Sequence, residues 1–150
     1  MKKSWCVLSI LMVVLLLTAN VFAVDEKESV VEKSKIHFID ALVQVESGGN
    51  VNAIGDGGAS FGCLQIQRGV IADVNRVYKT HYSHIDAFDK RKAESICRKY
   101  LSYWGKHYEK VTNKTATLEI LARIWNGGPN GYKKAQTIAY WNKVREKLDS

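Results

Sequence analysis

Apolar residues recur at the three- and four-residue spacing of an amphipathic helix in five separate stretches of this chain. The apolar positions are Ile36, Ile39, Leu42 and Val43 in the first stretch; Val70, Ile71, Val74, Val77 and Tyr78 in the second; Ala93, Ile96, Cys97, Tyr100, Leu101 and Trp104 in the third; Leu118, Leu121, Ala122 and Trp125 in the fourth; and Ile138, Trp141, Val144 and Leu148 in the fifth. The pattern predicts a single, mainly α-helical domain of about five helices.

Glycine-rich segments separate some of the predicted helices. The first helix must end at Gly48-Gly49-Asn50 and the fourth at Gly127-Gly128-Pro129, because glycine and proline remove helix propensity and side-chain contacts. Residues 50–62 are rich in Gly, Asn, Asp and Ser, a composition typical of turns. We expect turns and at most a short hairpin after the first helix, so that the domain is α+β at most.

The first 23 residues follow the pattern of a secretory signal peptide. A positive start at Lys2 and Lys3 precedes an almost purely apolar run over residues 7–17, and Val21-Phe22-Ala23 then offers a cleavage site. The run is shorter than the ~20 residues that span a bilayer, which favours cleavage over the alternative of an uncleaved anchor. We expect a signal peptide at 1–23, a mobile lead-in at 24–35 and one folded domain at 36–150.

The composition is that of an ordinary globular protein, since 46% of the 150 residues are hydrophobic and 25% are charged. These shares exclude a disordered, fibrous or multi-span membrane protein. The formal net charge of +7 indicates an acidic partner, such as nucleic acid, an anionic membrane or a bacterial wall polymer. Because the basic residues are spread along every predicted helix and no aromatic-interleaved RNA motif is present, we expect no nucleic-acid partner.

Two cysteines, Cys63 and Cys97, follow the predicted signal peptide. In an oxidising compartment they could form a disulfide or remain two buried thiols, and the sequence leaves both alternatives open. Neither cysteine has the spacing of a metal ligand set, and the four histidines are scattered. The sequence therefore indicates no metal site and no cofactor.

Glu46 is the polar residue with the most informative position. It follows Ile39 by seven residues, Leu42 by four and Val43 by three, so it falls on the apolar face of the first helix. Burial and the helix C-terminus both disfavour the charged carboxylate and raise its pKa. A carboxylic acid that stays protonated near neutral pH can act as a general acid. Periodicity alone leaves open that this terminal side chain turns out to water.

Asp56 lies in the turn-rich segment between Gly55 and Gly57, where solvent and backbone donors would keep its carboxylate charged. Glycoside cleavage uses two carboxyl groups in opposed environments, one to protonate the leaving oxygen and one to attack or stabilise the oxocarbenium-like centre. An aspartate beside glycine is also a routine turn residue. At this stage both roles are open for Asp56.

A third cluster runs from Trp125 to Tyr132 and reads Trp-Asn-Gly-Gly-Pro-Asn-Gly-Tyr. Aromatic faces, amide side chains and exposed glycine backbone suit the stacking and hydrogen bonding of sugar rings. A helix C-cap followed by a proline-containing turn explains the glycines as well. The cluster is therefore a candidate sugar-binding segment.

These motifs resemble those of lysozyme-like muramidases. The first group is Val45-Glu46-Ser47-Gly48-Gly49-Asn50, Gly55-Asp56 and Gly62-Cys63-Leu64-Gln65-Ile66; the second is Ala122 to Gly131 with Tyr140-Trp141-Asn142-Lys143-Val144. The second group closely resembles the invertebrate-type lysozyme (destabilase) family, over roughly residues 38–144. The first group is also similar to goose-type lysozymes and bacterial lytic transglycosylases, which share the broader fold.

The resemblance implies a lysozyme-like fold and hydrolysis of the β-1,4 bond between N-acetylmuramic acid and N-acetylglucosamine in peptidoglycan strands. It assigns Glu46 as proton donor and Asp56 as nucleophile or stabiliser. The candidate substrate-binding residues are Gln65, Trp125, Asn126, Gly127, Gly128 and Tyr132. With the signal peptide, it implies a monomer that is secreted, or periplasmic in a Gram-negative bacterium, without a stable membrane anchor after cleavage.

Two features depart from these families. Invertebrate-type lysozymes are rich in disulfides, whereas only Cys63 and Cys97 follow the signal peptide here. Trp125 stands where that family has histidine and where transglycosylases have the tyrosine that orients the catalytic glutamate. Two alternatives therefore stay open beside hydrolysis: a lytic transglycosylase that forms 1,6-anhydromuramic products, and a non-catalytic module that binds the cell wall.

Overall fold

The computed structural model describes residues 37–150, so the expected signal peptide and lead-in lie outside the described residues. A helix over residues 37–47 comes first in this part of the chain. The elements that follow are β1 (Ile54–Gly55), η1 (Asp56–Gly58), β2 (Ser60–Phe61), β3 (Ile66–Gln67), α2 (Arg68–Tyr78), η2 (His84–Phe88), α3 (Lys90–Thr112), α4 (Leu118–Gly127), η3 (Gly131–Lys133) and α5 (Thr137–Leu148). Within residues 37–150, the five predicted α-helices and the short hairpin segment are confirmed.

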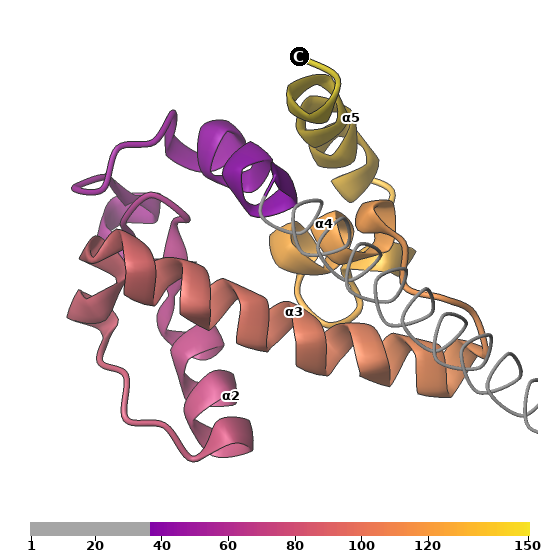
Figure 1. The fold of residues 1–150 in the computed structure, drawn as a ribbon, viewed down its shortest axis with the longest axis horizontal. Coiled ribbons are helices and arrows are strands. Elements are labelled where there is room, and N and C mark those ends of the chain that lie inside the picture. Colours follow the sequence, from indigo (N-terminus) through magenta and orange to yellow (C-terminus); the bar gives the residue numbers. More distant parts are fainter. Residues whose placement is uncertain (1–36) are drawn as a thin grey trace, which may run out of the picture. The chain divides into compact units, whose positions relative to one another are not determined.

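The long helix α3 packs against α2 and α4, and α5 packs against α4. Figure 1 shows α3 running across the domain, with α2 near one end and α4 towards the other. Contacts link α2 with α3, α3 with α4, and α4 with α5. The core between them contains fully buried aliphatic side chains from successive elements, among them Leu42, Leu64, Ile96, Ile124 and Val144. Burial of such side chains is the main stabilising contribution to a domain of this kind.

Helix α3 is longer than the stretch from Ala93 to Trp104 that the periodicity predicted. Asp89 caps its start, since the Asp89 side chain accepts a hydrogen bond from the Lys92 backbone N–H at 3.1 Å. Gly105 lies inside the helix and is buried. Its missing side chain leaves room for Leu121 of α4, since a Cβ on Gly105 would lie 2.9 Å from Leu121 Cδ2. The helix ends at Thr112 and is followed by Asn113, which adopts the left-handed conformation at φ 55°.

Helix α5 buries a different face from the predicted one at its start. Ile138, expected on the apolar face, is 46% exposed, whereas Thr137 is 1% exposed. The Thr137 hydroxyl is satisfied inside the protein, because it lies 2.9 Å from the Gly131 carbonyl oxygen and 2.7 Å from that of Lys134. A hydrogen-bonded threonine can therefore take the interior position that hydrophobicity alone assigned to isoleucine.

The short strands form a three-stranded antiparallel sheet in the order β1-β2-β3. Gly55 pairs with Ser60, and Ser60 pairs with Gln67. Because side chains alternate between the two faces of a strand, directly paired residues share a face. The register therefore brings Ser60 and Gln67 together next to Asp56, which follows β1 directly.

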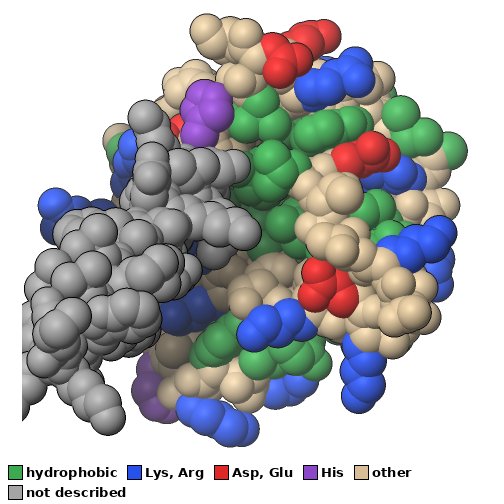
Figure 2. Space-filling model, turned by 45° about the vertical axis from the view of Figure 1, so that its right-hand side comes forward, with side chains coloured by type: hydrophobic (Ala, Val, Ile, Leu, Met, Phe, Trp, Pro, Cys, Tyr) green, Lys and Arg blue, Asp and Glu red, His purple; other side chains and the backbone are tan. Residues whose placement is uncertain are grey.

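Surface charge is dispersed on the face that Figure 2 shows, where Lys and Arg side chains are scattered among Asp and Glu. None of the helices within residues 37–150 combines the length and the apolar character needed to cross a membrane.

Candidate active site

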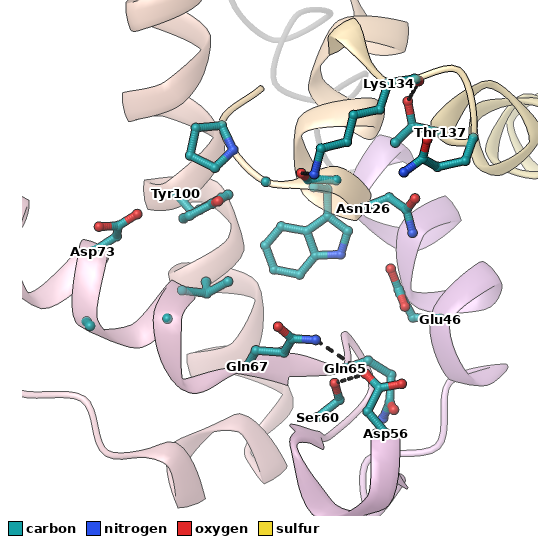
Figure 3. A pocket seen from close by; sticks show the side chains of 18 residues that line it. Glu46, Asp56, Ser60, Gln65, Gln67, Asp73, Tyr100, Asn126, Lys134 and Thr137 are labelled. Atoms are coloured by element: carbon teal, nitrogen blue, oxygen red, sulfur yellow. Dashed lines mark hydrogen bonds between the residues drawn. The ribbon is translucent and has the colours of Figure 1, made fainter. Parts of the chain in front are cut away.

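A cavity of about 770 Å³ lies between the hairpin segment, α2, α3 and the end of α4. It brings together residues that are far apart in the sequence. The residues of the sequence analysis that line it are Glu46, Asp56, Gln65, Trp125, Asn126, Gly127 and Gly128. Figure 3 shows Glu46 on its helix and Asp56 on the hairpin, at the same end of the cavity. A volume of this size is within the range of small-molecule and oligosaccharide sites.

The carboxyl group of Glu46 points into the cavity from a half-buried position. Burial raises the pKa of Glu46 above its usual value of 4.5, and the nearby charge of Asp56 acts in the same direction. Hydrogen bonds from Tyr140 and Trp125 oppose this shift by stabilising the charged form. The rise in pKa that the helical spacing predicted is confirmed, because burial outweighs these two hydrogen bonds.

Tyr140 holds Glu46 in place, and the sequence analysis did not identify it as a site residue. The Tyr140 hydroxyl donates a 2.7 Å hydrogen bond to Glu46 Oε1 across 94 residues of sequence. Burial, with the neighbouring Glu46 charge, raises the pKa of Tyr140 well above its usual value, so the hydroxyl remains a proton donor. The available signal was the position of Tyr140, three residues after Thr137 and four before Val144 on the buried face of α5.

We expect the Tyr140→Phe substitution to move the alkaline limb of the pH–rate profile to higher pH. The tyrosine hydroxyl stabilises the charged form of Glu46, so its removal raises the pKa of Glu46 further. A general acid is active while protonated, so activity then persists to higher pH. The measurement is kcat against pH, with Tyr132→Phe as a matched control; an unshifted alkaline limb in Tyr140→Phe contradicts this prediction.

Asp56 is exposed to solvent and anchored through one of its two oxygens. Its Oδ2 accepts hydrogen bonds from Ser60 Oγ at 2.5 Å and from Gln67 Nε2 at 3.3 Å. These donors are the two residues that the strand register places opposite each other. The other oxygen, Oδ1, has no hydrogen bond among the described residues and is free to face a substrate. Asp56 has a left-handed backbone with φ 50°, which aspartate tolerates better than most residues.

Gln65 lies beside Asp56 because the backbone of Gly55 leaves room for it. Gln65 Nε2 donates a 2.9 Å hydrogen bond to the Gly62 carbonyl oxygen. A Cβ on Gly55 would come within 2.0 Å of Gln65 Oε1, so any larger residue there would displace the amide. Gln65 also has a left-handed backbone, with φ 48°. The hairpin thus holds two site residues in sparsely populated conformations, as is common at functional sites.

The end of α4 forms another wall of the cavity. Trp125 is only 8% exposed, and its ring meets the Tyr100 ring edge-on with the centroids 5.8 Å apart. Its indole is therefore mainly a packed support for Glu46, with little ring surface open to a sugar. Asn126 is exposed at the cavity and Gly127 and Gly128 offer their backbone there.

Tyr132 is not among the residues that line this cavity. Its ring packs at right angles on Tyr108, with the centroids 4.8 Å apart, and Lys133 Nζ lies 5.3 Å from the same ring. Its carbonyl oxygen accepts a 2.6 Å hydrogen bond from Arg123 Nη2. The structure therefore does not bring the half-buried Tyr132 ring to the cavity that contains the other candidate residues.

Both cysteines are free and fully buried. The structure thus has the second of the two alternatives that the sequence left open, two separate thiols without a disulfide. Burial raises the pKa of both thiols, most strongly that of Cys97. Within residues 37–150, no three His, Cys, Asp or Glu side chains gather in a way that could hold a metal ion.

The known proteins to which this chain is similar in sequence include lysozymes. No family model matches the chain. The chain is similar to invertebrate-type lysozyme 6 of Caenorhabditis elegans, with 29% identity over 93 residues that span 59% of this chain and 67% of that protein. It is similar to a lysozyme of Ostrea edulis, with 33% identity over 57% of this chain and 58% of that protein. It is also similar to a lysozyme of Meretrix lusoria, with 38% identity over 35% of this chain and 40% of that protein.

The fold has a counterpart among solved structures. The chain is similar to a chain in the crystal structure of Aeromonas hydrophila PliI in complex with Meretrix lusoria lysozyme, with a TM-score of 0.56 and 27% sequence identity. The similarity covers 73% of this chain and 87% of that chain.

Proposed function

We propose that this chain, a lysozyme-type glycoside hydrolase with the motifs of the invertebrate-type family, is a secreted muramidase. Its substrate would be the β-1,4 bond between N-acetylmuramic acid and N-acetylglucosamine in peptidoglycan. The observation that carries the proposal is the pair of carboxyl groups on one cavity. Glu46 is half-buried with a raised pKa, whereas Asp56 is exposed and hydrogen-bonded.

The opposed environments of the two carboxyl groups define two chemical roles. Protonated Glu46 donates its proton to the glycosidic oxygen as the bond to C1 breaks, so that the leaving sugar departs as an alcohol. Asp56 supplies negative charge to the oxocarbenium-like C1, either as an ion pair or by bonding to it through Oδ1. Glu46, now a carboxylate, takes a proton from the water that adds to C1, and this step restores both residues.

The remaining cavity residues suit the binding of a sugar chain. Gln65 and Asn126 carry amides that donate and accept hydrogen bonds, as sugar hydroxyl and N-acetyl groups require. Gly128 lets a sugar approach the backbone without obstruction, because no heavy atom lies within 4 Å of where its Cβ would be. Trp125 and Tyr140 support Glu46 from behind, so the proton donor is preorganised before the substrate arrives.

A lytic transglycosylase is the second candidate, and the contact between Tyr140 and Glu46 is the observation that favours it. The sequence lacks the transglycosylase tyrosine at Trp125, yet a tyrosine from α5 donates a hydrogen bond to the glutamate. In that reaction the C6 hydroxyl of the muramic acid residue attacks its own C1, and Asp56 is dispensable.

Mass spectrometry of purified peptidoglycan after digestion distinguishes these reactions. We expect products that end in a reducing muramic acid, formed by the addition of water. Products that are lighter by one water and carry 1,6-anhydro ends would identify the reaction as transglycosylation instead of hydrolysis. If no sugar is released while the protein still binds peptidoglycan, the cavity belongs to a non-catalytic wall-binding module.

A further inference from the structure

Lys134 lines the cavity and has no role in the steps described above. Lys134 is the one basic residue among the described residues that line the cavity, where the acidic side chains are Glu46, Asp56 and Asp73. Without Lys134 the lining would carry only acidic charge and would repel an anionic ligand. Figure 3 shows Lys134 on the wall opposite Asp56 and Gln67.

The Lys134 side chain is solvent-exposed, yet it makes a defined contact with the end of α4. Its Nζ donates a 2.7 Å hydrogen bond to the Gly127 carbonyl oxygen. Its stem passes close to the same glycine, since a Cβ on Gly127 would lie 3.4 Å from Lys134 Cδ. This arrangement removes much of the conformational entropy that a lysine otherwise loses on binding a ligand.

The backbone at Lys134 is fixed as well. Its carbonyl oxygen accepts hydrogen bonds from Thr137 Oγ1 at 2.7 Å and from Arg123 Nη2 at 3.4 Å. Thr137 is 1% exposed, so one of these two hydrogen bonds ties the exposed Lys134 to a buried side chain. Lys134 therefore presents its charge from a rigid segment.

The ammonium group of Lys134 keeps unused capacity toward the cavity. It carries three N–H donors and uses one of them on Gly127. Among residues 37–150 it makes no ion pair, although three carboxyl groups line the same cavity. A positioned, unpaired cation with free donors is complementary to a carboxylate on the ligand.

We propose that Lys134 binds a carboxylate carried by the glycan strand, either on its sugar or on its stem peptide, and so selects acidic strands over neutral ones. This inference rests on the proposed function, because it concerns the same cavity. In muramic acid the lactyl ether carries a free carboxylate when no peptide is attached, and in peptide-bearing strands the carboxylates lie on the peptide. A chitin oligosaccharide has the same backbone without either group. Lys134 thus acts as a specificity-determining residue.

The test compares three probes: a peptide-free glycan of alternating N-acetylglucosamine and N-acetylmuramic acid, the same glycan with its stem peptides, and a chitin oligosaccharide of equal length. The variant is Lys134→Met, which keeps a long unbranched stem against Gly127 and removes the charge. Lys133→Met is the matched control, because Lys133 lies over the Tyr132 ring and does not line the cavity.

We expect Lys134→Met to lower the ratio of kcat/KM for the peptide-free glycan to that for chitin roughly tenfold, as for loss of one charge-assisted contact. Lys133→Met should leave this ratio unchanged, and Lys134→Arg, which keeps the positive charge, should retain most of it. If Lys134→Met lowers kcat/KM relative to chitin only for the peptide-bearing strands, the bound carboxylate belongs to the peptide. An equal loss on all three probes, or no loss, overturns the proposal.

Binding measured by titration calorimetry with the Glu46→Gln variant separates this inference from the proposed function. If the protein cleaves none of the probes, the proposed function fails. The role of Lys134 can still be tested by binding in that case. The inference is supported if Glu46→Gln binds the muramic glycan more tightly than chitin and the double variant with Lys134→Met does not. Equal affinity for both glycans overturns it.

Discussion

Replacing Glu46 by glutamine should lower kcat by about 10²- to 10⁴-fold, the usual contribution of a positioned general acid. Glutamine has nearly the same shape and keeps an oxygen that can accept the hydrogen bond from Tyr140, yet it has no proton to give to the glycosidic oxygen. The measurement is the initial rate of release of reducing ends from purified peptidoglycan. If the variant keeps more than half of the wild-type rate, Glu46 is not the general acid.

The same variant should be at least as stable as the wild-type protein, which separates a catalytic loss from unfolding. The fold raises the pKa of Glu46 above 4.5, so it favours the protonated form. As pH rises from 4.5 through the raised pKa, Glu46 therefore lowers the free energy of unfolding, because the charged form is the one that burial penalises. Glutamine has no such dependence. We expect the Tm difference in favour of Glu46→Gln to grow from acidic to neutral pH, by thermal unfolding followed with circular dichroism.

Replacing Asp56 by asparagine should lower kcat by about 10²- to 10³-fold, the typical loss when a group that stabilises charge in the transition state is removed. The asparagine oxygen can still accept hydrogen bonds from Ser60 and Gln67, so the hairpin should keep its shape. Only the negative charge beside C1 is lost. Steady-state rates on peptidoglycan, with KM determined separately, measure this effect.

Asp40→Asn is the matched control for that experiment. Asp40 is an exposed aspartate on the helix over residues 37–47 and does not line the cavity. Its substitution changes the net charge by the same amount and should leave kcat unchanged. Full activity in Asp56→Asn, accompanied by 1,6-anhydro products, would instead assign the attack to the C6 hydroxyl of the substrate and leave Asp56 as a turn residue.

Local sequence determined the helices and one side of the site. The three- and four-residue spacing of apolar positions predicted five helices, because a helix repeats its buried face with a fixed period whatever it packs against. Glycine at Gly48 and Gly128 predicted two helix ends for the same local reason. The position of Glu46 on the apolar face also predicted that its pKa is raised, since burial of that face buries the carboxyl.

Tertiary structure decided how the other residues meet Glu46 and Asp56. The hydroxyl of Tyr140 reaches Glu46 from 94 residues away, and Ser60 and Gln67 converge on Asp56 through strand register. The half-buried Tyr132 ring packs on Tyr108, although neighbours of Tyr132 in the sequence line the cavity. These outcomes depend on contacts between distant elements and on hydrogen bonds of buried polar groups. Periodicity reports which face of an element is buried, and only packing decides which partner that face meets.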